Sequence, residues 1–412
     1  GDRGIAVIDF GGQYAHLIVN RVRRLGVHGQ LFPPSVSKKE LEKAGVAGVI
    51  ISGGGGSVKG NFKDVVASVD LVGILDLNVP VLGLCLGHQF LAVALGGDVE
   101  QNEDMEEYGP TLVTIAGDAA GAEGASMLAG FTGAQVRVWM SHGESVVKVP
   151  PGFRVMARSD RCPVVVMGDP SRRIYGVQYH PEVTHSERGQ ELLGAFASLC
   201  DTTPWNMASY AETIEQQLRD SVGPDRKVFM FVSGGVDSSV AFALLTRALG
   251  KERTYGLLVD HGLLRKDEAR LVEEAMRAIG FDNIHVEDAS ERFLGRLRGV
   301  CEPEAKRKII GDSFLDTKTD VAQRLHLDGD EWLLGQGTIY PDTIESGGTS
   351  HASKIKTHHN RVEAVEKLIQ EGRVVEPLKE LYKDEVRTLG RLLGLPEHFI
   401  ERHPFPGPGL GV

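Results

Sequence analysis

The sequence has few cysteines, no basic excess and no long apolar run. Its 4 cysteines among 412 residues form no Cys-x-x-Cys pair, so neither a zinc site nor a disulfide framework is predicted, and reduced cytosolic thiols fit best. The net charge of −11 argues against a general nucleic-acid or membrane-surface binder, because no basic excess neutralises phosphates. Asp70, Asp76 and Asn78 interrupt the most apolar region, and no basic-then-apolar leader precedes Ile5. We therefore expect no membrane span and no secretion signal.

The length of 412 residues is sufficient for two or three domains, at roughly 150 residues each. Short apolar strands alternate with helical stretches in both halves, with the strands expected at 5–9, 48–52, 79–84, 228–232, 254–259 and 284–287. This alternation predicts an α/β protein with two doubly wound domains in tandem, whose functional groups gather at the carboxyl ends of parallel strands. A polar, proline-containing stretch at 201–205 marks the boundary, which gives domains at 1–203 and 204–401.

Residues 228–240 read as a buried strand, a Ser-Gly-Gly turn and a helix start. That geometry favours an anion, because free N–H groups point outward at a helix N-terminus and glycines allow close approach. Asp237 would repel a phosphate unless a divalent cation bridges the two, so we interpret it as a Mg²⁺ ligand. A helix-capping role for Asp237 is the alternative. The expected nucleotide contacts are Ser233, Gly234, Gly235, Val236, Asp237, Ser238 and Ser239.

This loop resembles the pyrophosphate-binding loop of the ATP pyrophosphatases, which adenylate a carbonyl oxygen and release pyrophosphate. The resemblance rests on the string Ser-Gly-Gly-Val-Asp-Ser-Ser at 233–239. The kinase-type pattern Gly-x-x-x-x-Gly-Lys-Ser/Thr is absent from the chain, which argues against transfer of a terminal phosphoryl group. ATP is therefore the expected co-substrate.

Cys85 lies in the string Gly-Leu-Cys-Leu-Gly at 83–87, between a predicted strand and a predicted helix. A sharp strand-to-helix turn needs small neighbours and exposes a nucleophile at a helix N-terminus, where thiolate is favoured over thiol. A lone cysteine in an apolar run is more often part of the core, so the flanking glycines carry the catalytic interpretation.

His180 and Glu182 follow another apolar strand, which begins near Ile174. A cysteine nucleophile needs a base that takes its proton and returns one to the leaving amine, and that base needs a partner that fixes its tautomer. Spacing by two places both side chains on one side of an extended segment, although Pro181 favours a turn. A His-Pro-Glu turn on its own is more often only structural.

The strings Gly-Leu-Cys-Leu-Gly-His-Gln at 83–89 and His-Pro-Glu at 180–182 resemble the class I glutamine amidotransferases, over about residues 5–200. The resemblance implies hydrolysis of the glutamine side-chain amide through a thioester. It makes Cys85 the nucleophile, His180 the acid and base, and Glu182 the residue that orients His180. The backbone N–H groups of Leu86 and of the loop 53–56, at Gly54, are then the expected oxyanion donors.

Four further strings complete a resemblance to the glutamine-hydrolysing GMP synthetases over essentially the whole chain. They lie at 335–342, 355–360, 381–387 and 402–409. The resemblance implies adenylation of xanthosine monophosphate (XMP) at O2 by magnesium-ATP, and displacement of AMP by ammonia from glutamine. Lys383 is expected to offset developing charge and Arg307 to contact the nucleotide substrate. The family continues into a C-terminal domain that forms a homodimer, so 402–412 is expected to be the start of that domain.

Two other functions fit parts of the pattern. Another amidating ligase with the same loop, such as an NAD synthetase, would adenylate a carboxylate, but the strings at 340–344 and 356–360 disfavour it. A non-catalytic glutamine-sensing module would keep the amidotransferase fold without the reaction. A glutaminase assay distinguishes that module from an enzyme.

Overall fold

The computed structural model describes residues 2–12, 14–54, 56–60, 63–119, 126–265, 267–327, 329–342 and 363–402. The chain forms two compact units that divide between Asn206 and Met207. The boundary expected at 203/204 lies in the segment that connects them, and this segment is tied to the first unit. Thr203 N–H donates to the carbonyl of Arg3 at 3.0 Å, and Trp205 N–H donates to the carbonyl of Gly26 at 2.9 Å. No helix in the described ranges is long and apolar enough to cross a membrane.

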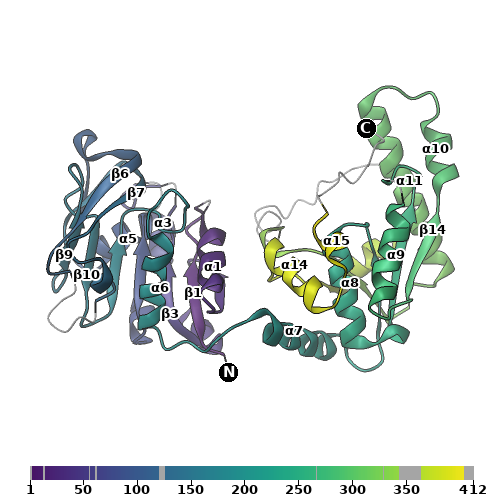
Figure 1. Ribbon diagram of the computed structural model, residues 1–412, viewed down its shortest axis with the longest axis horizontal. Coiled ribbons are helices and arrows are strands. Elements are labelled where there is room, and N and C mark those ends of the chain that lie inside the picture. Colours follow the sequence, from purple (N-terminus) through teal and green to yellow (C-terminus); the bar gives the residue numbers. More distant parts are fainter. Residues whose placement is uncertain are drawn as a thin grey trace. The chain divides into compact units, whose positions relative to one another are not determined.

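The first unit is built on a sheet of nine described strands (Figure 1). Its parallel part runs in the order β2 (Gly29–Phe32), β1 (Gly4–Ile8), β3 (Val46–Ile51), β4 (Val81–Leu84) and β11 (Ile174–Val177). It continues antiparallel through β10 (Val166–Asp169), β9 (Arg154–Arg158), β6 (Glu107–Ile115) and β7 (Gln135–His142). The alternating pattern predicted the parallel part, whereas the antiparallel extension was not predicted.

Helices and a short ribbon complete this unit. The helices are α1 (Ala15–Arg24), α2 (Lys38–Lys43), α3 (Lys63–Ala67), α4 (Leu71–Asp76), α5 (Leu86–Ala94) and α6 (Gly189–Leu199), with single 3₁₀ turns at η1 (Glu103–Met105) and η2 (Ala129–Phe131). Strands β5 (Asp98–Gln101) and β8 (Glu144–Lys148) pair antiparallel as a separate ribbon. This ribbon brings Glu144 to the carboxyl end of the main sheet, beside the end of β7.

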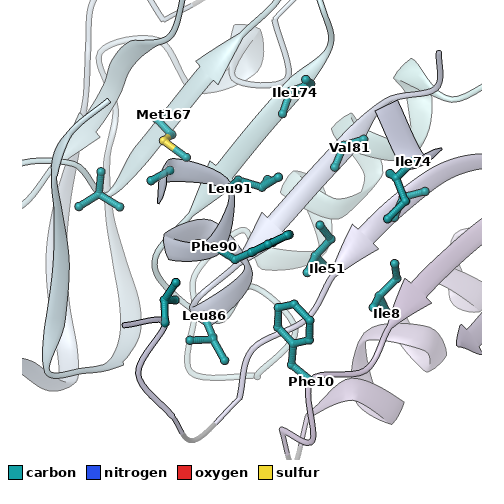
Figure 2. Close-up of a cluster of buried hydrophobic side chains, with 14 of the residues drawn as sticks. Ile8, Phe10, Ile51, Ile74, Val81, Leu86, Phe90, Leu91, Met167 and Ile174 are labelled. Atoms are coloured by element: carbon teal, nitrogen blue, oxygen red, sulfur yellow. The ribbon is translucent and has the colours of Figure 1, made fainter. Parts of the chain in front are cut away.

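The core of the first unit holds α5 against the sheet (Figure 2). Phe90 and Leu91 of α5 pack with Ile51 of β3 and Phe10, and all four are at most 3% exposed. Burial of each such side chain stabilises the fold by about 1.5–3 kcal/mol. The N-terminus of α5, and with it Cys85, is therefore fixed by the packing of the helix behind it.

The second unit has a five-stranded parallel sheet among its described residues, in the order β14 (Ile284–Asp288), β13 (Thr254–Asp260), β12 (Lys227–Phe231), β15 (Trp332–Gly335) and β16 (Val374–Val375). The helices among its described residues are α7 (Met207–Val222), α8 (Val236–Leu249), η3 (Lys251–Arg253), α9 (Glu268–Ala278), α10 (Ser290–Leu297), α11 (Pro303–Arg324), α13 (Glu363–Gln370), α14 (Lys383–Leu392) and α15 (Glu397–Ile400). The chain extends the sheet from β12 toward β14 and then crosses to β15. Ligands of open α/β sheets bind at such a switch point.

Candidate active sites

Cys85 lies at a sharp turn between β4 and α5. Its backbone has φ 52° and ψ −107°, a conformation that side chains rarely adopt. Glycines make the turn feasible: a Cβ on Gly83 would lie 2.4 Å from the carbonyl oxygen of Gly87, and one on Gly87 would lie 2.2 Å from that of Ile51. The Gly-x-Cys-x-Gly spacing therefore forms the sharp strand-to-helix turn that the sequence indicated. The turn places the thiol in the lining of a cavity.

His180 and Glu182 lie beside that thiol. The His180 Nδ1 atom is 2.8 Å from Glu182 Oε1, and both side chains are buried. A Cβ on Gly53 would lie 3.2 Å from both the Cys85 Cβ and the His180 Cε1, which shows how closely the two catalytic candidates approach. Burial lowers the pKa of His180, but hydrogen bonds to Cys85 and Glu182 outweigh it and raise the pKa above its ordinary value. The imidazole is thus built to accept a proton.

The turn that carries these two residues is held from outside. The Ser186 hydroxyl donates to the carbonyl of His180 at 2.6 Å, and the Arg21 guanidinium donates to the carbonyl of Glu182 at 3.0 Å. A Cβ on Gly189 would lie 1.9 Å from the carbonyl oxygen of Pro181, so α6 starts directly against the turn. β11 ends at Val177, and Pro181 lies in the turn that follows, as expected, where His180 and Glu182 stay in contact.

A cavity of about 530 Å³ opens over the thiol, within the size range of small-molecule sites of about 300–1,000 Å³. The residues that line it include Gly11, Gly12, Tyr14, Gly53, Gly54, Cys85, Leu86, Gln89, Tyr108, Ser141, Gly143, Glu144, His180 and Glu182. The two expected oxyanion donors, Leu86 and Gly54, are neighbours, since a Cβ on Gly54 would lie 2.9 Å from Leu86 Cδ2. Leu86 is the first residue of α5, where backbone N–H groups have no partner within the helix.

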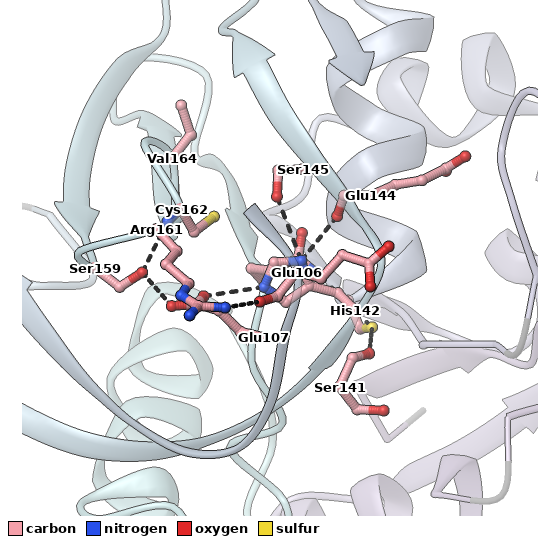
Figure 3. A network of polar contacts seen from close by, with 12 residues as sticks. Glu106, Glu107, Ser141, His142, Glu144, Ser145, Ser159, Arg161, Cys162 and Val164 are labelled. Carbon is pink, nitrogen blue, oxygen red and sulfur yellow. Dashed lines mark hydrogen bonds and ion pairs between the residues drawn. The ribbon is translucent and has the colours of Figure 1, made fainter. Parts of the chain in front are cut away.

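The antiparallel strands supply one wall of this cavity that the motifs did not predict. Ser141 at the end of β7 and Glu144 at the start of β8 flank a corner that a buried network holds (Figure 3). His142 Nε2 is 3.1 Å from Glu107 Oε2, and His142 Nδ1 is 2.9 Å from the carbonyl oxygen of Glu144. The network fixes the backbone around Ser141, whose carbonyl oxygen lies 3.7 Å from the Cys85 sulfur.

Glu107, His142 and Cys162 also form a set of metal-ligand types. Their ligand atoms lie within 4.8 Å of one another and all three residues are buried. The carboxylate of Glu107 is already engaged, because His142 faces one oxygen and the Ser159 hydroxyl donates to the other at 2.6 Å. These hydrogen bonds occupy both carboxylate oxygens of Glu107. We therefore assign the three residues a structural role at the corner between β7 and β8.

The nucleotide loop, which is the string at 233–239, follows β12 and runs into the first turn of α8 in the second unit. Gly234 has φ 85°, a conformation that favours glycine, and α8 starts at Val236. The Ser238 hydroxyl accepts the backbone N–H of Ser233 at 3.1 Å, which folds the loop back over the helix start. A Cβ on Gly337 would lie 3.1 Å from the Cα of Ser238, so the segment after β15 packs on the same loop.

Lys383 and Arg402 approach this loop from the C-terminal part of the unit. Lys383, the first residue of α14, places its Nζ 2.6 Å from Asp237 Oδ1. The Arg402 guanidinium donates to the carbonyl of Gly234, and its Nη1 lies 3.8 Å from Glu268 Oε1. Burial lowers the pKa of Arg402 from its ordinary value. The sequence predicted a role for Lys383 but none for Arg402, whose side chain carries no local signature of this contact.

Two family models match the chain: glutamine amidotransferase class-I at residues 6–199 and asparagine synthase at residues 209–321. Two strains of Leptospira interrogans have a relative named "Probable GMP synthase (glutamine-hydrolyzing)" that is 46% identical over 99% of this chain and 66% of its own length. A GMP synthase (glutamine-hydrolyzing) from Clostridium perfringens is 43% identical over 99% of this chain and 77% of its own length. The chain belongs to the glutamine-hydrolysing GMP synthase family. It spans about two thirds of the length of the Leptospira relatives.

Within this GMP synthase fold, Asp237 fits the role of a Mg²⁺ ligand. Its carboxylate stands in the first turn of α8, beside the loop that is expected to hold phosphates, and Lys383 engages one of its two oxygens. Hard carboxylate and phosphate oxygens are the donors that Mg²⁺ prefers.

Among the residues expected at the synthetase site, Arg307 is the one for which the structure shows no link to the nucleotide loop in the ranges described. It lies on α11, where its guanidinium pairs with Glu304 one turn earlier at 3.4 Å, and its side chain is 60% exposed. Its contact with the nucleotide substrate stays a prediction. The strings at 355–360 and 403–409 lie outside the described residues.

Proposed function

We propose that the chain catalyses glutamine-dependent GMP synthesis: glutamine is hydrolysed to glutamate and ammonia, and ammonia replaces the adenylated O2 of XMP. The observation that carries the proposal is the cavity in which Cys85, His180 and Glu182 meet, on the same polypeptide as the loop 233–239. Membership of the family supports both halves. We expect the reaction to take place in the cytosol and the full-length protein to form a homodimer.

In the glutaminase half, Cys85 Sγ would attack the side-chain amide carbon of glutamine while His180 takes the thiol proton. Glu182 holds His180 Nδ1, so that the other ring nitrogen faces the sulfur. The N–H groups of Leu86 and Gly54 would stabilise the oxyanion. His180 then returns the proton to the departing ammonia, and a water that His180 deprotonates hydrolyses the thioester to glutamate.

In the synthetase half, the residues Ser233 to Ser239 would hold the pyrophosphate end of ATP against the start of α8. Mg²⁺ bound by Asp237 would neutralise phosphate charge during adenylation of XMP. Lys383 would offset the charge that develops when pyrophosphate leaves, and it is already within 2.6 Å of Asp237. Arg307 would contact XMP. Ammonia then attacks C2 and AMP leaves with the former O2.

The test varies the nitrogen source and follows AMP and pyrophosphate release. Replacing Cys85→Ala should abolish glutamine-dependent synthesis, because the nucleophile is lost, while ammonium salts still support synthesis at near wild-type rates. Cys301→Ala is the matched control, since Cys301 is exposed and remote from the triad in sequence. Equal loss with both nitrogen sources would place Cys85 in the fold or in the synthetase site and would overturn the proposal. Absence of AMP release from ATP in the presence of XMP, with either nitrogen source, would contradict the synthetase half.

A further inference from the structure

Gln178 lies beside the nucleophile because of the register of the sheet. Strands β4 and β11 pair in parallel with Leu84 opposite Val177, so the residues that directly follow the two strands are Cys85 and Gln178. The backbone N–H of Cys85 donates to the carbonyl of Val177 at 2.8 Å and fixes this pairing. Gln178 is fully buried, and its Nε2 donates to Cys85 Sγ at 3.7 Å.

The orientation of the Gln178 amide is set by a second glutamine. Gln89 Nε2 donates both to the carbonyl of Glu144 at 2.9 Å and to Gln178 Oε1 at 3.2 Å. Both hydrogens of that amide group are thereby used. A flipped Gln178 would set its NH₂ group against the NH₂ group of Gln89 and its oxygen against the sulfur. A buried amide avoids such unpaired contacts, so its N–H points at the sulfur.

Besides His180, the sulfur of Cys85 has two polar neighbours with opposite effects. The carbonyl oxygen of Ser141, 3.7 Å away, accepts an S–H and so favours the neutral thiol. The Gln178 N–H donates to the sulfur, and a hydrogen bond to an anion is about twice as strong as one between neutral groups. The partial positive charge at the N-terminus of α5 also favours the thiolate, as the Gln178 N–H does.

We infer that Gln178 is a further catalytic residue of the glutaminase site, whose amide N–H stabilises the Cys85 thiolate. The inference rests on the proposed glutaminase function and deepens it. Gln178 acts when the proton passes from Sγ to His180, before the carbon–sulfur bond forms. It acts again when that bond breaks during thioester hydrolysis and the electron pair returns to sulfur. In the thioester itself the sulfur is uncharged and the contact is weak.

Alkylation of Cys85 by iodoacetamide measures thiolate formation without any substrate. The background is Cys301→Ser, because Cys301 is the exposed thiol apart from the site. The other two thiols are protected, since burial raises the pKa of Cys162 to about 11 and that of Cys200 to about 12. Gln178→Met keeps the side-chain length and removes the donor, and Gln178→Glu places a carboxylate against the sulfur.

We expect Gln178→Met to lower the alkylation rate at pH 7 by about 10-fold, the value of one charge-assisted hydrogen bond, and Gln178→Glu to lower it further. The rates should converge with wild type at high pH, which a loss of access would not allow. The glutaminase kcat/KM should fall in parallel, while ammonium-dependent synthesis is retained. Gln190→Met makes the same chemical change at an exposed position of the same unit and should change none of these rates.

Wild-type alkylation rates at pH 7 in Gln178→Met, or faster alkylation in Gln178→Glu, would overturn the inference. If Gln178→Met does not support ammonium-dependent synthesis, the variant has a folding defect. The alkylation rate of Gln178→Glu, whose side chain has the same shape as that of glutamine, then tests the inference by itself. Failure of the proposed function is a separate outcome. It would appear as absent glutaminase activity in the wild type, whereas the alkylation comparison would still report on Gln178.

Discussion

A methyl group at residue 53 would press on both the nucleophile and its base. Because an added Cβ would be 3.2 Å from both the Cys85 Cβ and the His180 Cε1, Gly53→Ala must displace these neighbours by a few tenths of an ångström. Misplacement of reacting groups on this scale lowers rates steeply, and we expect glutaminase kcat to fall by about 10–100-fold. Steady-state glutamate production measures it, with synthesis from ammonium salts unchanged.

Gly117→Ala provides the matched control for that change. A Cβ on Gly117 meets nothing within 4 Å, and this glycine belongs to the same unit. It should leave glutaminase kcat within about twofold of wild type, because surface substitutions rarely alter the fold. A Gly53→Ala protein with full glutaminase activity would show that Cys85 and His180 do not need the spacing seen here.

At the scale of elements, the nucleotide loop is held by a residue from the far end of the unit. Arg402, which follows α15, binds the carbonyl of Gly234 and faces Glu268 at the start of α9. Arg402→Ala should raise the KM for ATP by about 10-fold or more, since the loop loses a charge-assisted hydrogen bond. Arg402→Lys should recover only part of the loss, because an ammonium group lacks the planar fork.

The measurement is ammonium-dependent synthesis at varied ATP concentration, with glutaminase activity as the internal reference. Arg391→Ala removes an exposed arginine of α14 that pairs with Glu397 at 2.6 Å, and it should leave the KM for ATP unchanged. If Arg402→Ala altered only thermal stability and left that KM at the wild-type value, the contact with Gly234 would be structural rather than functional.

Elements that are buried on both faces were the predictable part of the fold. β1, which reads Gly-Ile-Ala-Val-Ile, is wholly buried and stands out as an apolar run. β6 is different: Tyr108 and Leu112 are exposed while Val113 is buried, and its partners are distant in sequence. Such a strand resembles a loop until its partner is known, so the antiparallel half of the sheet could not be predicted.

The same distinction applies to the sites. Cys85 and the nucleotide loop carry local signatures, namely glycines at the positions where a sharp turn needs them. The contact of Gln178 with Cys85 depends instead on the register between β4 and β11, which are about ninety residues apart in the chain. Ser141 depends in the same way on β7. Contacts set by strand register need the three-dimensional structure.

At the scale of the molecule, the two units have separate cores and separate candidate sites. We therefore expect two unfolding transitions in calorimetry. Magnesium-ATP should raise the midpoint temperature of only one of them. At 100 times its Kd, a ligand stabilises by about 2.7 kcal/mol, which corresponds to about 5–10 °C for a unit of this size. Asp237→Asn should remove most of that shift. A single transition that moves as a whole would show that the units unfold together.

The proposed presence of a glutaminase and a synthetase on one chain also suggests how nitrogen moves. Ammonia is mostly protonated in neutral water and is then no nucleophile, so we expect transfer that is shielded from the solvent. An enzyme that consumes free ammonia should leave glutamine-driven synthesis largely intact and should suppress synthesis from ammonium salts. Complete loss of glutamine-driven synthesis under the scavenger would refute shielded transfer.

The backbone at residue 85 works against thermal stability. A side chain at φ 52° and ψ −107° adds strain on the order of 1–3 kcal/mol, which glycine would not carry. In a lineage supplied with abundant free ammonia, random drift from cysteine to glycine at this position would yield a sturdier protein. Persistence of the thiol in such a lineage would then indicate continued dependence on glutamine.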